Sequence, residues 1–275
     1  MEAVSYTAQW TAAARAVESE RTTDALFTDP FARELAAPRG FELLGKYGGG
    51  GLLEFIAIRT RFYDDAVTTV LRGGGIDQVV LVAAGMDTRA FRLTWPDGTV
   101  VYEVDHSGLI EEKRARLARL SARPAVERRE VGADLAQDWL PALAAAGHDP
   151  RRPTLWVAEG LFFFLTQDQA ATLLRTLRGV SAPGSHLVTD MASKALLRSP
   201  FNQTFLTALK DDGTPWLFGT DEPEPFLDAN GWKTRELKEP GEPGASPRRW
   251  PYEVQPRTRR GVSRSWLIRA ETAGD

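Results

Sequence analysis

Three acidic residues follow predicted strands, each at or just after the point where its strand ends. They are Asp105, Asp134 and Glu159, and Gly85 ends the strand that precedes them. Ligands of doubly wound α/β sheets bind beyond the carboxyl ends of the strands, so we expect these residues to meet at one edge of a sheet. Asp105 comes twenty residues after Gly85, where a ribose-binding carboxylate is expected. A cap for the next helix is the alternative role of Asp105.

The other two acids each have more than one interpretation. The Asp134 carboxylate can accept a hydrogen bond from an adenine amino group while the Leu135 backbone N–H donates to the ring. Alternatively, Asp134 caps its own loop. Glu159 can hold an ammonium group or face an acceptor substrate, or it can be a structural acid paired with Arg59. The sequence leaves these alternatives open.

The turn after the first predicted strand limits the kind of nucleotide that can bind. Six apolar residues, 79–84, lead to Gly85, and a glycine lets the backbone approach a ligand closely. A dinucleotide fingerprint needs three glycines, but its positions here hold Ala83, Gly85 and Thr88. Asp87 also places a negative charge where a diphosphate would lie. A nucleoside with a cationic amino-acid arm therefore fits this turn better than a dinucleotide does.

Arg59 lies on the apolar stripe of the helix predicted for residues 52–71. An arginine that faces a core must be paired or hydrogen-bonded, because an isolated charge is costly to bury. Arg59 therefore needs a buried anion, which is either a protein carboxylate or the carboxylate of a ligand.

Strand and helix patterns alternate for five units, and two further strands follow without a helix long enough for a crossover between them. This order predicts an α/β fold with a Rossmann-like, seven-stranded, mostly parallel sheet. We expect its last two strands to form a C-terminal antiparallel hairpin, and helices to cover both faces. We expect a single domain over residues 1–275, with residues 1–72 as an N-terminal helical cap.

Composition excludes several classes of function. The 275 residues are 43% hydrophobic and 26% charged, which is ordinary for a soluble globular protein. The net charge of −3 gives no basic footprint, so nucleic acid is not an expected partner. The chain has no cysteine and only three scattered histidines, so we expect no metal site. The sequence shows neither a signal-peptide pattern nor an apolar stretch long enough to span a membrane, so a cytoplasmic location is expected.

Seven short motifs occur along residues 7–190: Arg15-Ala16-x-Glu18, Thr28-Asp29-Pro30-Phe31-Ala32, Ile58-Arg59-Thr60-Arg61, Ala84-Gly85-Met86-Asp87-Thr88-Arg89, Glu103-Val104-Asp105, Asp134-Leu135 and Ala158-Glu159-Gly160-Leu161. As a set, and in this order, they resemble the leucine carboxyl methyltransferase-like group of S-adenosylmethionine (SAM)-dependent methyltransferases. This group includes carboxyl methyltransferases of polyketide pathways.

The resemblance implies SAM as the cofactor and assigns residues to its parts. It implies that Arg59, with Arg15 as a more weakly aligned second contact, holds the SAM carboxylate, and that Glu159 lies near the amine. The remaining implied contacts are the Ala83–Gly85 turn under the methionine part, Asp105 on the ribose, and Asp134 with Leu135 at the adenine. Ala83 departs from the glycine of other members. The resemblance fades after residue 191, so we expect segment 192–220 to determine acceptor specificity. Its aromatic residues are Phe201, Phe205, Trp216 and Phe218.

The predicted function is a SAM-dependent O-methyltransferase that converts a carboxylate of a small molecule, aromatic or polyketide-like, to a methyl ester. A phenolic acceptor is the alternative, but a phenol needs a base, and His106 and His186 are the imidazoles available. A carboxylate is already anionic, so no base and no catalytic residue is assigned. The rival classes are an NAD(P)-dependent oxidoreductase and a non-catalytic SAM-binding protein. The oligomeric state cannot be inferred from the sequence.

Overall fold

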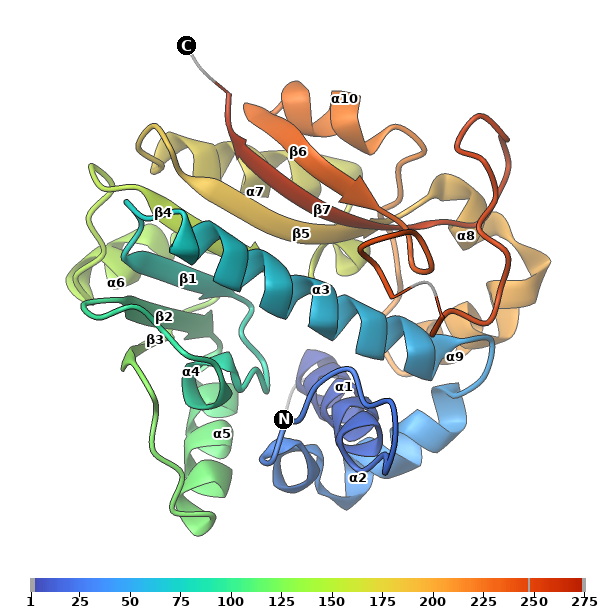
Figure 1. Ribbon diagram of the computed structural model, residues 1–275, viewed down its shortest axis with the longest axis horizontal. Helices are drawn as coiled ribbons and strands as arrows, with labels where there is room; N and C mark the ends of the chain where they lie inside the picture. Colours follow the sequence, from blue (N-terminus) through green and yellow to red (C-terminus); the bar gives the residue numbers. More distant parts are fainter. Residues whose placement is uncertain (1–2, 247, 274–275) are drawn as a thin grey trace.

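The computed structural model describes residues 3–246 and 248–273, and it contains a seven-stranded sheet of order β3-β2-β1-β4-β5-β7-β6. Strands β1 to β5 are parallel, and β7 runs antiparallel to both β5 and β6 (Figure 1). This arrangement confirms the predicted mostly parallel sheet with its C-terminal hairpin. The strands are β1 (Gln78–Val82), β2 (Val100–Asp105), β3 (Glu127–Gly132), β4 (Thr154–Ala158), β5 (His186–Ala192), β6 (Trp232–Lys238) and β7 (Ser265–Thr272).

The alternation of side chains along β1 builds two cores, one on each face of the sheet. Val79 and Leu81 enter the core shared with α3 and α5, whereas Val80 and Val82 enter the core shared with α6, α7 and α10. Every residue of β1 and β4 is buried, as expected for central strands covered on both faces. Figure 1 shows α3 crossing one face of the sheet, with α7 on the other. The helices are α1 (Ala3–Ser19), α2 (Ala32–Tyr47), α3 (Leu52–Arg72), α4 (Arg89–Arg92), α5 (Ser107–Arg119), α6 (Leu140–Ala145), α7 (Gln167–Gly179), α8 (Lys194–Arg198), α9 (Gln203–Asp211) and α10 (Pro223–Asp228), with the 3₁₀ turns η1 (Phe162–Phe164) and η2 (Pro200–Asn202).

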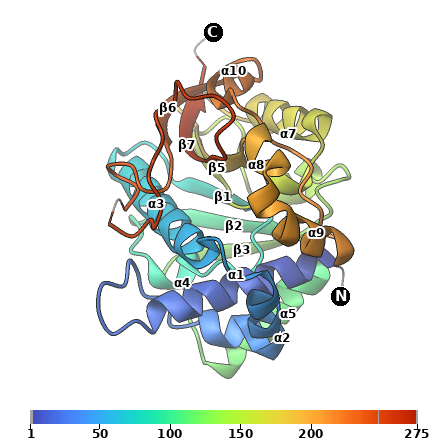
Figure 2. The ribbon, with the colours of Figure 1, turned by 90° about the vertical axis from the view of Figure 1, so that its right-hand side faces the viewer.

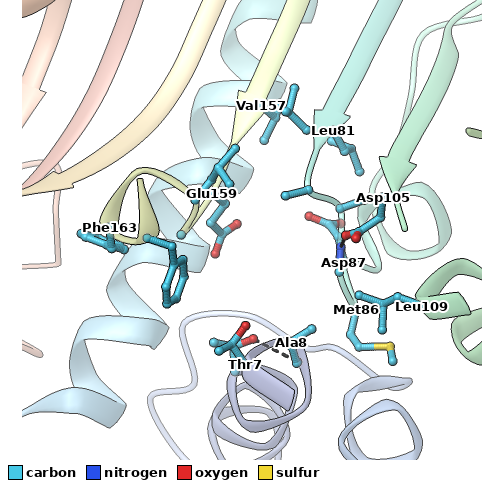
Figure 3. A pocket seen from close by; sticks show the side chains of 18 of the residues that line it. Thr7, Ala8, Leu81, Met86, Asp87, Asp105, Leu109, Val157, Glu159 and Phe163 are labelled. Carbon is cyan, nitrogen blue, oxygen red and sulfur yellow. Dashed lines mark hydrogen bonds between the residues drawn. The ribbon is translucent and has the colours of Figure 1, made fainter. Parts of the chain in front are cut away.

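The N-terminal helices divide into two positions. Helix α3 packs along the sheet, whereas α1 and α2 pack against each other beside it, with α9 next to α2 (Figure 2). The alanine-rich face of α1, which includes Ala12 and Ala13, is fully buried and allows this close packing. Helix α1 thereby covers the carboxyl ends of the central strands (Figure 3).

No helix in the described ranges is both long enough and apolar enough to cross a membrane.

Candidate active site

A cavity of about 350 Å³ lies at the carboxyl ends of β1, β2 and β4, facing α1 and α3. Such a volume is within the range of small-molecule sites, roughly 300–1,000 Å³. In Figure 3, Asp87 and Asp105 lie on one side of it, Glu159 and Phe163 on the other, and Thr7 and Ala8 of α1 close it. All eight residues selected from the sequence line this cavity: Arg15, Arg59, Ala83, Gly85, Asp105, Asp134, Leu135 and Glu159. Their contacts with a ligand remain predictions.

The Asp105 carboxylate is fixed by the backbone at the end of β2. Its Oδ2 accepts from the Gly85 N–H at 2.7 Å, and its Oδ1 accepts from the His106 N–H at 2.7 Å. Only 8% of the residue is exposed, and this burial raises the pKa of the Asp105 carboxyl despite the two backbone donors. Each oxygen has accepted one bond and can accept another from the cavity side.

The turn between β1 and α4 has two residues in left-handed backbone conformation. Gly85 has φ +51°, and Ala83 has φ +55°, which is unfavourable for a residue with a side chain. A Cβ on Gly85 would lie 3.1 Å from the Cβ of Ala8, so the absence of a side chain lets α1 approach the turn. The Asp87 Oδ1 accepts from the Arg89 N–H at 2.6 Å and thus satisfies a backbone donor in the first turn of α4, whose N-cap residue is Thr88.

Asp134 and Leu135 follow β3 at the outer end of the cavity. The Asp134 Oδ1 accepts from the Ala136 N–H at 2.9 Å, which is the loop-capping role considered from the sequence. Asp134 is nonetheless exposed and lines the cavity. Among the described residues, none is seen to donate to its second carboxylate oxygen. The capping and ligand-binding roles are therefore compatible.

Glu159 bridges two buried arginines at the end of β4. Its Oε1 is 3.0 Å from Arg59 Nε and its Oε2 is 2.7 Å from Arg89 Nη1. Burial raises the pKa of Glu159, but the positive charges of Arg89 and Arg59 more than offset it, and the pKa lies below its usual value. The buried anion that Arg59 requires is thus a protein carboxylate, which is the structural alternative left open by the sequence.

Asp190 of β5 is the second partner of Arg59. Its Oδ2 lies 3.3 Å from Arg59 Nη1, and its Oδ1 accepts from Tyr63 Oη–H at 2.9 Å and from the Gly160 N–H at 2.7 Å. Gly160 has φ +67°, and a Cβ there would lie 3.2 Å from Arg59 Nη1. A glycine is therefore needed where the guanidinium passes the end of β4.

Arg15 of α1 reaches the turn below Gly85. Its Nε donates to Asp29 Oδ2 at 3.0 Å, and its Nη2 donates to the Met86 carbonyl at 2.5 Å. Asp29 also accepts from the Thr88 hydroxyl at 2.7 Å. These bonds join α1 to the β1–α4 turn and place Arg15 at the cavity wall.

The other half of the cavity is apolar and aromatic. Trp216 stacks on Phe163 with ring centroids 4.2 Å apart and an angle of 12° between the rings. Of the four aromatic residues selected in segment 192–220, only Trp216 lines the cavity. Phe205 packs edge-on behind it at 5.2 Å, Phe201 is 97% exposed, and Phe218 is buried in the opposite core. Phe201, Phe205, Trp216 and Phe218 lie in a 3₁₀ turn, a short helix and a loop, so no single pattern in the sequence could separate their positions.

Sequence reasoning missed Arg89 and Asp190. Arg89 is 2% exposed and pairs with Asp64, Asp87 and Glu159. No pattern in the sequence indicates this burial, because the four-residue helix that carries Arg89 is too short to show an apolar stripe. Asp190 interrupts an apolar strand, and a buried acid in such a run signals a buried cation.

His106 lines the cavity, whereas His186 begins β5 and is absent from the lining. Among the described residues, no group of three histidines, aspartates or glutamates is arranged to hold a metal ion.

Comparison with known proteins places this geometry in context. The family model for leucine carboxyl methyltransferase matches residues 8–178. A relative from Mycobacterium avium (strain 104), provisionally named S-adenosyl-L-methionine-dependent methyltransferase, is 43% identical over 211 residues, which cover 69% of this chain and 67% of the relative.

Two solved structures share the fold. A provisionally assigned methyltransferase from Thermobifida fusca has a TM-score of 0.61 at 17% identity, covering 97% of this chain and 94% of that one. Magnesium protoporphyrin IX methyltransferase from Synechocystis, solved with bound S-adenosylhomocysteine (SAH), has a TM-score of 0.52 at 14% identity and covers 88% and 97% of the two chains.

Proposed function

Because the chain belongs to the leucine carboxyl methyltransferase family and is a SAM-dependent methyltransferase, we propose that it methylates a carboxylate of a small molecule to give a methyl ester. The observation that carries this proposal is a single cavity with two unlike halves. One half presents Asp105, Asp134 and the Gly85 turn, and the other is walled by Phe163 and Trp216. A polar nucleoside and an apolar acceptor can lie end to end in such a space.

The residues of the first half fit SAM chemically. Asp105 has two unused acceptor positions for ribose hydroxyls, and Asp134 and Leu135 offer an acceptor and a backbone donor for the adenine edge. Arg15 and Arg59 are already paired with protein carboxylates, but both line the cavity, and we propose that they also contact the carboxylate of the methionine part while Glu159 lies near its amine. SAM supplies a methyl group already activated by a positively charged sulfur.

The protein's own part in the reaction is to align the acceptor and exclude water. A carboxylate oxygen takes the methyl group as the bond between methyl and sulfur breaks, which leaves a neutral ester and neutral SAH. No proton moves, so this acceptor needs no base. The wall formed by Phe163, Trp216 and Phe55 carries no group that could deprotonate a phenol, whereas His106, which also lines the cavity, directly follows Asp105 in the half proposed for the ribose.

The test is transfer of a labelled methyl group from SAM to a panel of small carboxylic acids and phenols. We expect a product that releases labelled methanol in mild alkali, as methyl esters do and methyl ethers do not. We also expect the rate to be independent of acceptor ionisation above about pH 5, because a carboxyl group has a pKa near 4. A base-stable product, with a rate that rises near the pKa of a phenol, would instead establish the phenolic alternative.

A further inference from the structure

A run of four glycines, Gly48–Gly51, joins the two N-terminal helices to the rest of the fold. Gly49, Gly50 and Gly51 all have positive φ, of +125°, +57° and +82°. A Cβ on Gly49 or Gly50 would meet no described atom within 4 Å, so this part of the run lies in open space. Successive glycines leave the link freer in φ and ψ than other residues would, and a hinge needs that freedom.

Helices α1 and α2 pack together as one body, which we call the α1–α2 unit (residues 3–47). A Cβ on Gly40 would lie 2.5 Å from the carbonyl oxygen of Gln9, so the two helices touch backbone to backbone. Helix α3, on the other side of the glycines, is instead tied to the sheet, because Arg59 pairs with carboxylates at the ends of β4 and β5. The border between the two bodies therefore falls at the glycine run.

The α1–α2 unit forms one wall of the cavity described above. Thr7 and Ala8 lie opposite the strand ends, so a cofactor in the cavity is enclosed between the unit and the sheet (Figure 3). A second cavity, of about 270 Å³, separates the unit from the segment after α9, and its lining includes Tyr6, Leu43 and Thr214. The unit is therefore not tightly packed on that side.

Arg249, between β6 and β7, reaches the α1–α2 unit from the opposite end of the chain. Its Nη1 is 3.1 Å from Asp24 Oδ2, and its Nη2 donates to Glu18 Oε2. Glu18 is 4% exposed, and its other carboxylate oxygen accepts from the Leu26 N–H at 2.8 Å. Glu18 ends the motif Arg15-Ala16-x-Glu18, yet it has no part in the proposed cofactor contacts. Its described partners tie the unit to the C-terminal part of the chain.

The segment that carries Arg249 is itself anchored to the sheet. This β6–β7 strap (residues 248–264) passes the N-terminal end of α3 (Figure 1, red). At its far end Arg264, beside β7, is 5% exposed and donates to the Gln255 carbonyl at 3.0 Å. A Cβ on Gly51 would lie 2.8 Å from Cε2 of Tyr252, so the strap also rests on the last glycine of the run. The strap thus connects the sheet, the hinge and the α1–α2 unit.

We propose that the α1–α2 unit opens about Gly48–Gly51 to admit and release the cofactor, and that Arg249 is the latch that holds it closed. In the closed state Arg249 pairs with Glu18, and opening separates the two. Arg15 and Lys46 also bond the unit to the rest of the fold, so loss of the latch increases opening without freeing the unit. The proposal holds for any methyl acceptor.

The first test measures how fast SAH binds and leaves in two latch variants, Arg249→Gln and Glu18→Gln. In the second variant the amide oxygen can still accept from the Leu26 N–H, so the local fold is kept. Because the ligand passes only through the open state, both the association and the dissociation rate should rise by the same factor, with Kd nearly unchanged. We expect about a 3-fold rise or more from the loss of this ion pair, measured by stopped-flow mixing.

The second test follows the α1–α2 unit directly. The chain has no cysteine, so spin labels attach only at introduced ones, Glu42→Cys in α2 and Asp168→Cys in α7, both exposed. Double electron–electron resonance gives the distribution of distances between the two labels. We expect two distances without ligand, a single one with SAH, and a larger share of the open distance when Arg249→Gln is added.

Arg257→Gln is the matched control. Arg257 belongs to the same strap but pairs with Glu242 at 3.0 Å and donates to the Leu237 carbonyl, both outside the α1–α2 unit. Its replacement should leave both SAH rates and the label distances as in the wild type.

Unchanged rates in both latch variants of a protein that binds SAH would overturn the proposal. So would label distances that are identical with SAH, without SAH and in Arg249→Gln. A faster dissociation with unaltered association would assign Arg249 to the shape of the closed site and would also overturn the latch. If SAH does not bind at all, the SAM-dependent function fails, whereas the ligand-free label distances still test the latch.

Discussion

Ala83, in the turn between β1 and α4, has a backbone conformation that residues with a side chain disfavour. Its φ of +55° belongs to the left-handed region, where a side chain costs roughly 1–2 kcal/mol, and the family resemblance places a glycine there. Glycine loses more conformational entropy on folding, by about 0.5–1 kcal/mol, so the net gain from replacing Ala83 is small. The alanine therefore keeps a methyl group in the cavity wall at little cost to the fold.

We predict that Ala83→Gly raises the melting temperature by about 1–3 °C, because the relief of strain slightly exceeds the entropy lost. The matched control is Ala84→Gly, a neighbouring position without positive φ, where glycine should lower stability by about 0.5–1 kcal/mol. Scanning calorimetry of both variants measures the difference. Equal destabilisation by the two substitutions would show that Ala83 is not strained.

Asp105 carries the pH dependence that we expect for cofactor binding. Burial raises the pKa of its carboxyl, and the proposed ribose contacts need the ionised form. SAH affinity should therefore be full at neutral pH and should fall as the pH drops through the raised pKa of Asp105, earlier than for an ordinary aspartate. Calorimetric titration across this range measures the effect.

Asp105→Asn is the companion variant. The asparagine amide would place a donor against the N–H of either Gly85 or His106, so we expect SAH binding to weaken by about 10-fold or more at neutral pH. The acidic loss of affinity should disappear in this variant. Persistence of the same pH profile would assign the titration to another group.

At the scale of elements, the pairing of Arg59 with Glu159 and Asp190 joins α3 to the ends of β4 and β5. The apolar stripe of α3 alone would predict that methionine is tolerated at position 59. The structure predicts otherwise, because Asp190 is fully buried and would lose its only described cation. Removing one member of a buried ion pair typically costs about 3–5 kcal/mol.

We therefore predict that Arg59→Met is destabilised by about that amount and that adding Asp190→Asn restores about 1 kcal/mol or more. The asparagine can still accept from Tyr63 and Gly160 while it carries no charge. Denaturant unfolding of the wild type, both single variants and the double variant gives the coupling energy. Strict additivity, or an unaltered midpoint for Arg59→Met, would contradict a structural role for this pair.

At the scale of the whole molecule, the sequence predicted the sheet because strand periodicity and turn chemistry are local. The same local signals located Gly85, Asp105, Asp134 and Glu159 at strand ends, and parallel strands bring such ends together. Two features escaped prediction. Arg89, the second partner of Glu159, lies in a helix too short for a pattern, and the Phe163–Trp216 stack joins residues 53 positions apart in the chain. Neither of these contacts leaves a periodic signal.

The same limit explains why the N-terminal segment was only partly anticipated. The alanine-rich composition of α1 predicted a helix, but its position over the strand ends depends on the close approach of Ala8 to Gly85 and on the bond from Arg15 to Met86. A role for residues 1–72 as a cap over bound cofactor and acceptor stays a prediction. The geometry that supports it is the placement of Thr7, Trp10 and Arg15 in the cavity wall.

The most direct test of the central claim, that one cavity holds cofactor and acceptor end to end, is a crystal structure of the SAH complex. We predict adenine beside Asp134 and Leu135, ribose hydroxyls on Asp105, and the sulfur facing the half of the cavity that is walled by Phe163 and Trp216. SAH bound outside this cavity, or with its sulfur facing away from these two rings, would contradict the account.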